Sequence, residues 1–146
     1  MTKEFLYDFI SQHNLAVIAT VSPENRPEAA IVGIAISESL EIIFDTLKTS
    51  RKYLNILQNN HVAFVIGWDN ETTLQYEGEA VELTGPDAVK YKEIYFAVFD
   101  DGKERAETWS GIVHFKITPA WIRYSNYNEP LNIEEMFFAQ GKLITK

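Results

Sequence analysis

Three basic residues gather within residues 48–52, where the sequence predicts the start of a helix. They are Lys48, Arg51 and Lys52, and Ser50 stands among them as a favourable helix N-cap. The positive end of a helix dipole disfavours such cations by about 0.3 to 1 kcal/mol each. A bound phosphate would compensate, because the Ser50 hydroxyl and the first-turn N–H groups can donate to it while the cations pair with it. The segment Lys48-Thr49-Ser50-Arg51-Lys52 therefore predicts a phosphate site.

The alternative is that Ser50 only caps the helix and that the cations reach Asp or Glu side chains. The whole chain carries 13 basic and 21 acidic residues, a net charge of -8, so its surface repels nucleic acid and anionic lipid at long range. An anionic ligand then needs a local cluster of cations and N–H groups. If nearby carboxylates already neutralise the cations, the phosphate interpretation loses its basis.

Composition removes other kinds of chemistry. The chain has no cysteine, which excludes disulfides, thiol nucleophiles and cysteine metal sites and agrees with a reducing compartment. No apolar run approaches the roughly 18 to 20 residues of a membrane helix, and the first residues lack the apolar stretch of a signal peptide. We therefore expect a soluble cytoplasmic protein, a single domain over residues 1–146, with neither nucleic acid nor membrane as a partner.

Apolar periodicity predicts the elements that position these cations. Helices are expected over residues 3–13, 50–59 and 86–99. Strands are expected over residues 15–21, 29–36, 40–46, 61–68, 73–83, 112–117 and 121–124. Residues 100–107 are interpreted as a charged loop, Thr118 and Pro119 as a break between the last two strands, and the tail from Asn128 receives no assignment.

The strand pattern indicates the fold class. Several strands are apolar without alternation, which indicates that both of their faces are covered, as in a small barrel wrapped by helices or by a second subunit. The segment 73–83 alternates instead, so that Gln75, Glu77 and Glu79 share a face turned to water or to a polar site. We expect a mainly β protein with flanking helices, built as a barrel of six to seven antiparallel strands.

A set of short segments in a fixed order adds a resemblance to a known family. The segments are Ile43-Phe44-Asp45-Thr46, then Ser50-Arg51-Lys52 with Asn55 and Leu57, then His61-Val62-Ala63-Phe64-Val65, then residues 75–82, which begin Gln-Tyr-Glu-Gly. Together they resemble the pyridoxamine 5′-phosphate oxidase-like family of FMN-binding split barrels, over about residues 15–85. Each motif is short and degenerate, so the order and spacing of the set carry the resemblance.

The resemblance implies a homodimer with FMN in clefts that both subunits share. By position, Thr46, Ser50, Arg51 and Lys52 would hold the phosphate. The residues around Ala30, Ile31 and Phe44, with Asp45 in the same segment, would flank the ribityl chain and the flavin, and Gln75 would approach the cofactor of the other subunit. Apart from the resemblance, Trp109 could line the pocket, because it closes a polar loop and does not lie within an expected strand.

The implied function is an FMN-dependent oxidoreductase that takes hydride from a nicotinamide donor or from another small substrate. True pyridoxamine phosphate oxidases often carry an arginine at the position of Ala30 and an Arg-x-His element near the carboxyl end. This chain has neither, so a flavin reductase or stress-type member is expected instead. The alternatives are a non-catalytic flavin- or haem-binding protein that uses the same cleft, and a deazaflavin in place of FMN. No catalytic residue is assigned, and the dispersed histidines give no reason to expect a metal site.

Overall fold

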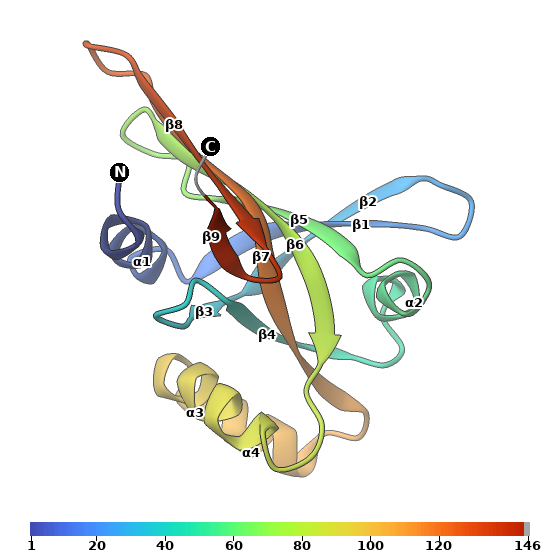
Figure 1. Ribbon diagram of the computed structural model, residues 1–146. Coiled ribbons are helices and arrows are strands. Elements are labelled where there is room, and N and C mark those ends of the chain that lie inside the picture. Colours follow the sequence, from blue (N-terminus) through green and yellow to red (C-terminus); the bar gives the residue numbers. More distant parts are fainter. Residues whose placement is uncertain (145–146) are drawn as a thin grey trace.

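The computed structural model describes residues 1–144 and consists of an antiparallel sheet with helices packed against it (Figure 1). The helices are α1 (Lys3–Ser11), α2 (Arg51–Gln58), α3 (Ala88–Val98) and α4 (Asp100–Thr108). The strands are β1 (Leu15–Val21), β2 (Pro27–Gly33), β3 (Ala35–Ile36), β4 (Ile42–Leu47), β5 (His61–Ile66), β6 (Thr72–Glu82), β7 (Ile112–Asn126), β8 (Asn132–Ala139) and β9 (Lys142–Ile144). The expected fold class, mainly β with flanking helices, is confirmed. Within this part of the chain no helix is both long and apolar enough to cross a membrane.

The strands form one sheet in the order β2-β1-β5-β6-β7-β4-β3, and β8 and β9 extend it from β7. Every pairing is antiparallel. The β1–β2 hairpin projects beyond the rest of the sheet, and α2 lies on the same side of the molecule and packs against β1 (Figure 1). This arrangement brings the start of α2 toward residues of the hairpin.

The sheet curves into a barrel that stays split. Only Ile34 separates β2 from β3, yet β2 pairs with β1 at one edge of the sheet and β3 pairs with β4 at the other. The chain therefore crosses between the two edges at Ile34, whose N–H donates to the Asn14 carbonyl at 2.9 Å. No ladder between β2 and β3 closes the barrel in residues 1–144. The split barrel is confirmed, whereas the single strand expected over residues 29–36 is divided in two.

Two apolar clusters explain why β4 shows no alternation. Its Ile42 and Phe44 point into the barrel core, where the Phe44 and Phe115 rings stack with centroids 5.6 Å apart. Ile43 points the other way, into a smaller cluster that includes Tyr95 of α3. The strand is thus buried on both faces, as its uninterrupted apolar sequence predicts.

One segment expected to be a loop is a helix. Residues 100–107 lie in α4, which begins with two acidic residues, Asp100 and Asp101, at the end of the helix dipole that favours negative charge. The loop prediction was wrong because α4 is polar nearly throughout, and its one buried residue is Gly102, which packs closely on Tyr95 and Phe96 of α3. Apolar periodicity therefore gives no sign of this helix, which is held instead by its contact with α3.

The break expected at Thr118 and Pro119 is also absent, because β7 runs without interruption from Ile112 to Asn126. Pro119 faces Gly78 of β6 next to a shift in register, which accommodates a residue that cannot donate to the ladder. A Cβ at Gly78 would lie 2.4 Å from the Thr118 carbonyl oxygen, so only glycine fits there. Most of the unassigned tail forms β8 and β9, which continue the sheet.

Candidate functional site

The first turn of α2 is built as the sequence predicts. Ser50 is the N-cap, and its Oγ accepts from the Tyr53 N–H at 3.3 Å. The same Oγ lies 2.9 Å from Thr46 Oγ1 at the end of β4, so the two hydroxyls expected at the phosphate are hydrogen-bonded to each other. The preceding turn is fixed by the Lys48 N–H, which donates to the Gly111 carbonyl at 2.9 Å. Ser50 and Thr46 therefore lie side by side at the start of α2, and their role at a phosphate stays a prediction.

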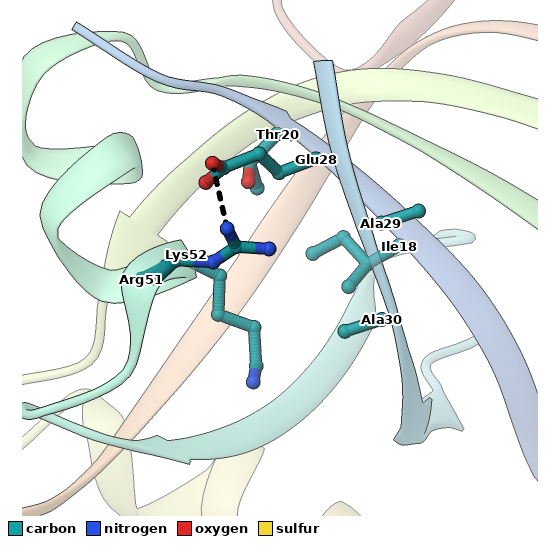
Figure 2. Close-up of a pocket in the computed structure, with 7 residues that line it drawn as sticks. All are labelled: Ile18, Thr20, Glu28, Ala29, Ala30, Arg51 and Lys52. Atoms are coloured by element: carbon teal, nitrogen blue, oxygen red, sulfur yellow. Dashed lines mark ion pairs between the residues drawn. The ribbon is translucent and has the colours of Figure 1, made fainter. Parts of the chain in front are cut away.

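A cavity of about 130 Å³ opens between α2 and the β1–β2 hairpin (Figure 2). Ligand pockets commonly measure roughly 300 to 1,000 Å³, so this cavity can hold a phosphate and part of its carrier but no complete nucleotide. The lining residues come from β1, β2 and α2; they are Ile18, Thr20, Glu28, Ala29, Ala30, Arg51 and Lys52. Three of the predicted site residues are thus brought together, namely Ala30, Arg51 and Lys52.

Arg51 is already paired with a carboxylate. Its Nη1 lies 3.1 Å from Glu28 Oε2, and the Arg51 side chain is 76% exposed while that of Glu28 is 19% exposed. The other oxygen, Glu28 Oε1, accepts from Asn55 Nδ2 at 2.8 Å. For Arg51 this is the arrangement that the alternative interpretation predicts, and its expected contact with a phosphate stays a prediction. The sequence could not indicate this ion pair, because Glu28 comes close only through the packing of α2 on the hairpin.

Lys52 differs from its neighbour. Figure 2 shows its side chain extending away from the Arg51 guanidinium, and within the described chain its ammonium has no carboxylate within 4.0 Å. Burial lowers the pKa of Lys52, and the charge of Asp45 offsets this only in part. A half-buried cation without an ion pair is stabilised by an anion that binds beside it. Lys52 is therefore the residue of the cavity that a phosphate suits best.

Two predicted residues on β4 point away from this cavity. Phe44 is fully buried in the barrel core, so its side chain cannot touch a cofactor at the surface. Asp45 lies on the opposite face of the strand, where its Oδ2 accepts from Arg105 Nη2 of α4 at 3.2 Å. Burial, together with Asp45, raises the pKa of the nearby Tyr95 hydroxyl well above its ordinary value. Asp45 is thus committed to a contact between the sheet and α4.

Ile31 and Gln75 lie on the outer face of the sheet. Ile31 is 65% exposed. Four residues on neighbouring strands pair in register, in the order Ile31 of β2, Val17 of β1, Val65 of β5 and Gln75 of β6. Directly paired strand residues point to the same face, so these four side chains form a row on the outside of the barrel. Neither Ile31 nor Gln75 lines the cavity beside α2 within one chain.

The remaining candidate, Trp109, follows the last residue of α4 and is more than half exposed. It does not line the cavity, although Gly111, two residues later, holds the turn before Ser50. The histidines are dispersed: His13 Nε2 lies 3.6 Å from Asp69, His61 is exposed on β5, and His114 is buried beneath α3. Among residues 1–144 no group of three or more His, Asp or Glu side chains could hold a metal ion.

Sequence reasoning missed three polar residues: Thr20 and Glu28, which line the cavity, and Asn55, which is hydrogen-bonded to both. Asn55 is 3% exposed, and its Nδ2 donates both to Glu28 and, at 3.0 Å, to Thr20 Oγ1. In the sequence, Asn55 belongs to one of the segments that carry the family resemblance and has no role of its own. The available signal was a polar side chain on the face of α2 that also carries the buried Ile56, because a buried amide needs partners. Thr20 and Glu28 carry no comparable local signal.

Comparison with known proteins bears on the fold and the family of this chain. A family model described as pyridoxamine 5′-phosphate oxidase matches residues 2–126. A search of curated protein sequences finds no significant match. The similarity is therefore carried by the family model and by solved structures.

Three solved structures illustrate the likeness. A heme-binding protein from Mycobacterium smegmatis has a TM-score of 0.78 at 13% identity, with 97% of this chain and 59% of that chain covered. General Stress Protein 26 from Bacillus anthracis has a TM-score of 0.70 at 20% identity, with 93% and 98% covered. A pyridoxamine 5′-phosphate oxidase-related, FMN-binding protein from Nostoc punctiforme has a TM-score of 0.68 at 13% identity, with 91% and 87% covered. At these identities the structures establish the fold alone. Because the family model spans most of the sequence, this chain belongs to the pyridoxamine 5′-phosphate oxidase-like family of split-barrel proteins.

Proposed function

We propose that the protein binds FMN and acts as an FMN-dependent oxidoreductase. The observation that carries this proposal is Lys52, a half-buried cation that has no ion pair in the described residues and lines a cavity at the start of α2 in a chain of this family. The phosphate of FMN is a dianion of suitable size for that cavity. The FMN-binding protein from Nostoc punctiforme, which shares the fold, supports the choice of cofactor.

The small volume of the cavity supports a homodimer. About 130 Å³ accommodates the phosphate end only, so the rest of the cofactor must find its surface elsewhere. The outer row of Ile31, Val17, Val65 and Gln75 offers such a surface, since it includes two large exposed apolar side chains, Ile31 and Val65. Burying these exposed apolar side chains against a second copy is favourable. In the proposed dimer, a second copy covers this face and its Gln75 approaches the flavin.

The roles of the chain's own groups follow from their positions. Lys52 would hold the phosphate by charge, and the hydroxyls of Ser50 and Thr46 would turn toward it from their present mutual hydrogen bond. FMN, when bound, would supply the redox chemistry: hydride acceptance from a nicotinamide donor or a small substrate, and reoxidation by dioxygen or another electron acceptor. The protein itself contributes binding, orientation and exclusion of water from the ring.

The test begins with freshly purified protein. Mass spectrometry of the released cofactor is expected to identify FMN, and light scattering is expected to give the mass of a dimer. Addition of NADH or NADPH without oxygen should bleach the flavin absorbance, and air should restore it. A preparation with FMN that neither donor bleaches would contradict the oxidoreductase and leave a flavin-binding protein. A preparation that neither contains nor takes up FMN would contradict the whole proposal.

A non-catalytic haem-binding protein is the second candidate. The likeness to the heme-binding protein from Mycobacterium smegmatis favours it, although this chain spans only 59% of that protein's length. Against it, the cavity beside α2 is lined by no histidine, methionine or tyrosine that could ligate the iron. His61 lines a separate cavity beside β1 and β5 and is the ligand that this second candidate would use. A Soret band that disappears in His61→Ala would support haem, and the same experiment with FMN serves as the control.

A further inference from the structure

We propose that Glu28 is a built-in competitor for the phosphate: it holds Arg51 when no ligand is present and thereby weakens FMN binding. This inference rests on the proposed function. It concerns how firmly the site holds FMN, a property that the family likeness does not assign to this residue. The carboxylate stands inside the cavity that the phosphate would enter, together with Arg51 and Lys52 (Figure 2).

The position of Glu28 is fixed by groups that are themselves buried. Asn55 donates from a single Nδ2 to Glu28 Oε1 at 2.8 Å and to Thr20 Oγ1 at 3.0 Å. Asn55 and Thr20 are each 3% exposed, so this part of the network lies in the protein interior. The carboxylate is therefore oriented by the fold and cannot swing away without leaving one of the two Asn55 amide N–H groups without its partner.

Arg51 is the mobile member of the pair. Most of its side chain lies in solvent, and its only ion pair among residues 1–144 is the one with Glu28. A phosphate that recruits Arg51 must share or break that pair, and it must also approach the fixed negative charge of Glu28. Like charges at such short range disfavour each other's charged forms.

The charge of the cavity gives the direction of the effect. Its lining contains two cations, Arg51 and Lys52, and one carboxylate, Glu28. Position 30, which also lines the cavity, is an alanine, and the lining contains no third cation from the described residues that would compensate. The proposed consequence is that FMN binds chiefly through Lys52 and exchanges readily.

The test compares FMN with riboflavin, which lacks the phosphate, by the quenching of flavin fluorescence at constant ionic strength. Glu28→Gln keeps an acceptor for Asn55 and removes only the charge, and it is expected to tighten FMN binding about five- to tenfold. Riboflavin binding should change less than about twofold, because the interaction is with the phosphate. The matched control is Glu24→Gln in the exposed β1–β2 turn, which makes the same change in net charge and should leave FMN binding as it is.

A double-mutant cycle with Arg51→Gln separates competition from simple repulsion. If Glu28 acts through Arg51, adding Glu28→Gln to Arg51→Gln should tighten FMN binding only about twofold. An equal gain in both backgrounds, weaker FMN binding in Glu28→Gln, or an equal gain for riboflavin would each overturn the inference. In those cases FMN still binds and the proposed function stands. If folded wild type and all variants fail to bind FMN, the proposed function fails, and the inference with it.

Discussion

Two arginine–carboxylate pairs in this protein have nearly the same separation but different surroundings. Arg105 of α4 lies 3.2 Å from Asp45, and Arg51 of α2 lies 3.1 Å from Glu28. The Arg105 side chain is 21% exposed and its partner 14% exposed, because α3 and α4 cover that side of β4. Arg51 stands largely in solvent at the edge of an open cavity.

The difference shows that the distance alone does not assign a role to an ion pair. On the side of β4 that α3 and α4 cover, called the covered side below, burial would lower the pKa of Arg105. The charge of Asp45, with help from Tyr95 and Asp101, nevertheless raises that pKa above its ordinary value. The charges there satisfy one another and hold α4 on the sheet. On the side of the cavity beside α2, called the open side below, the Arg51 guanidinium can exchange partners, because water and ligands reach it. We therefore propose a structural role for the first pair and a binding role for the second.

The largest expected effect is on the open side. Replacing Arg51 and Lys52 together by Ala should weaken FMN binding at least about 100-fold, or about 2.8 kcal/mol, because both cations of the cavity are lost. The stability to urea should change little, since neither side chain is fully buried. Titration of FMN into the refolded variant measures the first effect and circular dichroism the second. Unchanged binding of FMN would contradict the location of the phosphate site.

The covered side should show the opposite pattern. Arg105→Gln leaves the Asp45 carboxylate half-buried and without its partner, which is expected to lower the free energy of unfolding by about 2 to 3 kcal/mol. FMN binding by the protein that remains folded should change little. The control is Asp101→Asn, which removes the exposed partner of Arg105 at 2.7 Å and should lower stability by less than about 0.5 kcal/mol. Equal losses in the two variants would show that burial does not distinguish these contacts.

The sequence predicts the open side better than the covered one. The Ser50 cap, the α2 helix and the cations depend on neighbouring residues, so local rules suffice to place them. The strands of the barrel follow from apolar runs for the same reason. Helix α4 and its pair with Asp45 depend on packing between distant segments, and its polar sequence gives no apolar period from which to expect a helix.

The contacts at the site that the sequence does not reveal have the same physical origin. Glu28 and Asn55 are 27 positions apart in the sequence, and their contact exists only because α2 packs against the β1–β2 hairpin. Phe44 and Asp45 are neighbours on β4, but successive side chains of a strand point to opposite faces. Phe44 therefore lies in the barrel core, whereas Asp45 contacts Arg105 of α4. The resemblance locates such positions along the chain and does not give the direction of each side chain.

His114 should make the covered side sensitive to pH. Its buried Nε2 has no hydrogen-bond partner among the described residues, and burial lowers the pKa of His114, with Asp45 opposing this and Lys92 and Arg105 adding to it. As the pH falls, His114 takes up a proton in the unfolded chain before it does so in the folded protein. The contribution of neutral His114 to stability is therefore fully present above the pKa of the unfolded state. It is lost as the pH falls toward the lower pKa of the folded state. The loss cannot exceed about 1.4 kcal/mol per pH unit for one group.

The variant His114→Phe isolates this contribution. It keeps ring contacts with Tyr95 and Phe96, whose centroids lie 5.6 and 5.5 Å away, and it removes the titrating group. Urea unfolding from pH 7.5 to 5 should give a flatter stability curve for His114→Phe than for the wild type. Parallel curves would assign the acid sensitivity to other groups. His61→Phe, at an exposed position of β5, is the matched control and should preserve the wild-type slope.

The smallest expected effect is the most direct test of the comparison. Arg51→Gln should lower the free energy of unfolding by less than about 0.5 kcal/mol, although it removes an ion pair as short as the one broken in Arg105→Gln. Glu28 keeps its hydrogen bond from Asn55 and faces an open cavity, so its charge stays solvated. Urea unfolding of Arg51→Gln and Arg105→Gln under the same conditions compares their losses in free energy of unfolding directly. A loss in Arg51→Gln as large as in Arg105→Gln would mean that Arg51 holds α2 on the hairpin, and its assignment to ligand exchange would then be wrong.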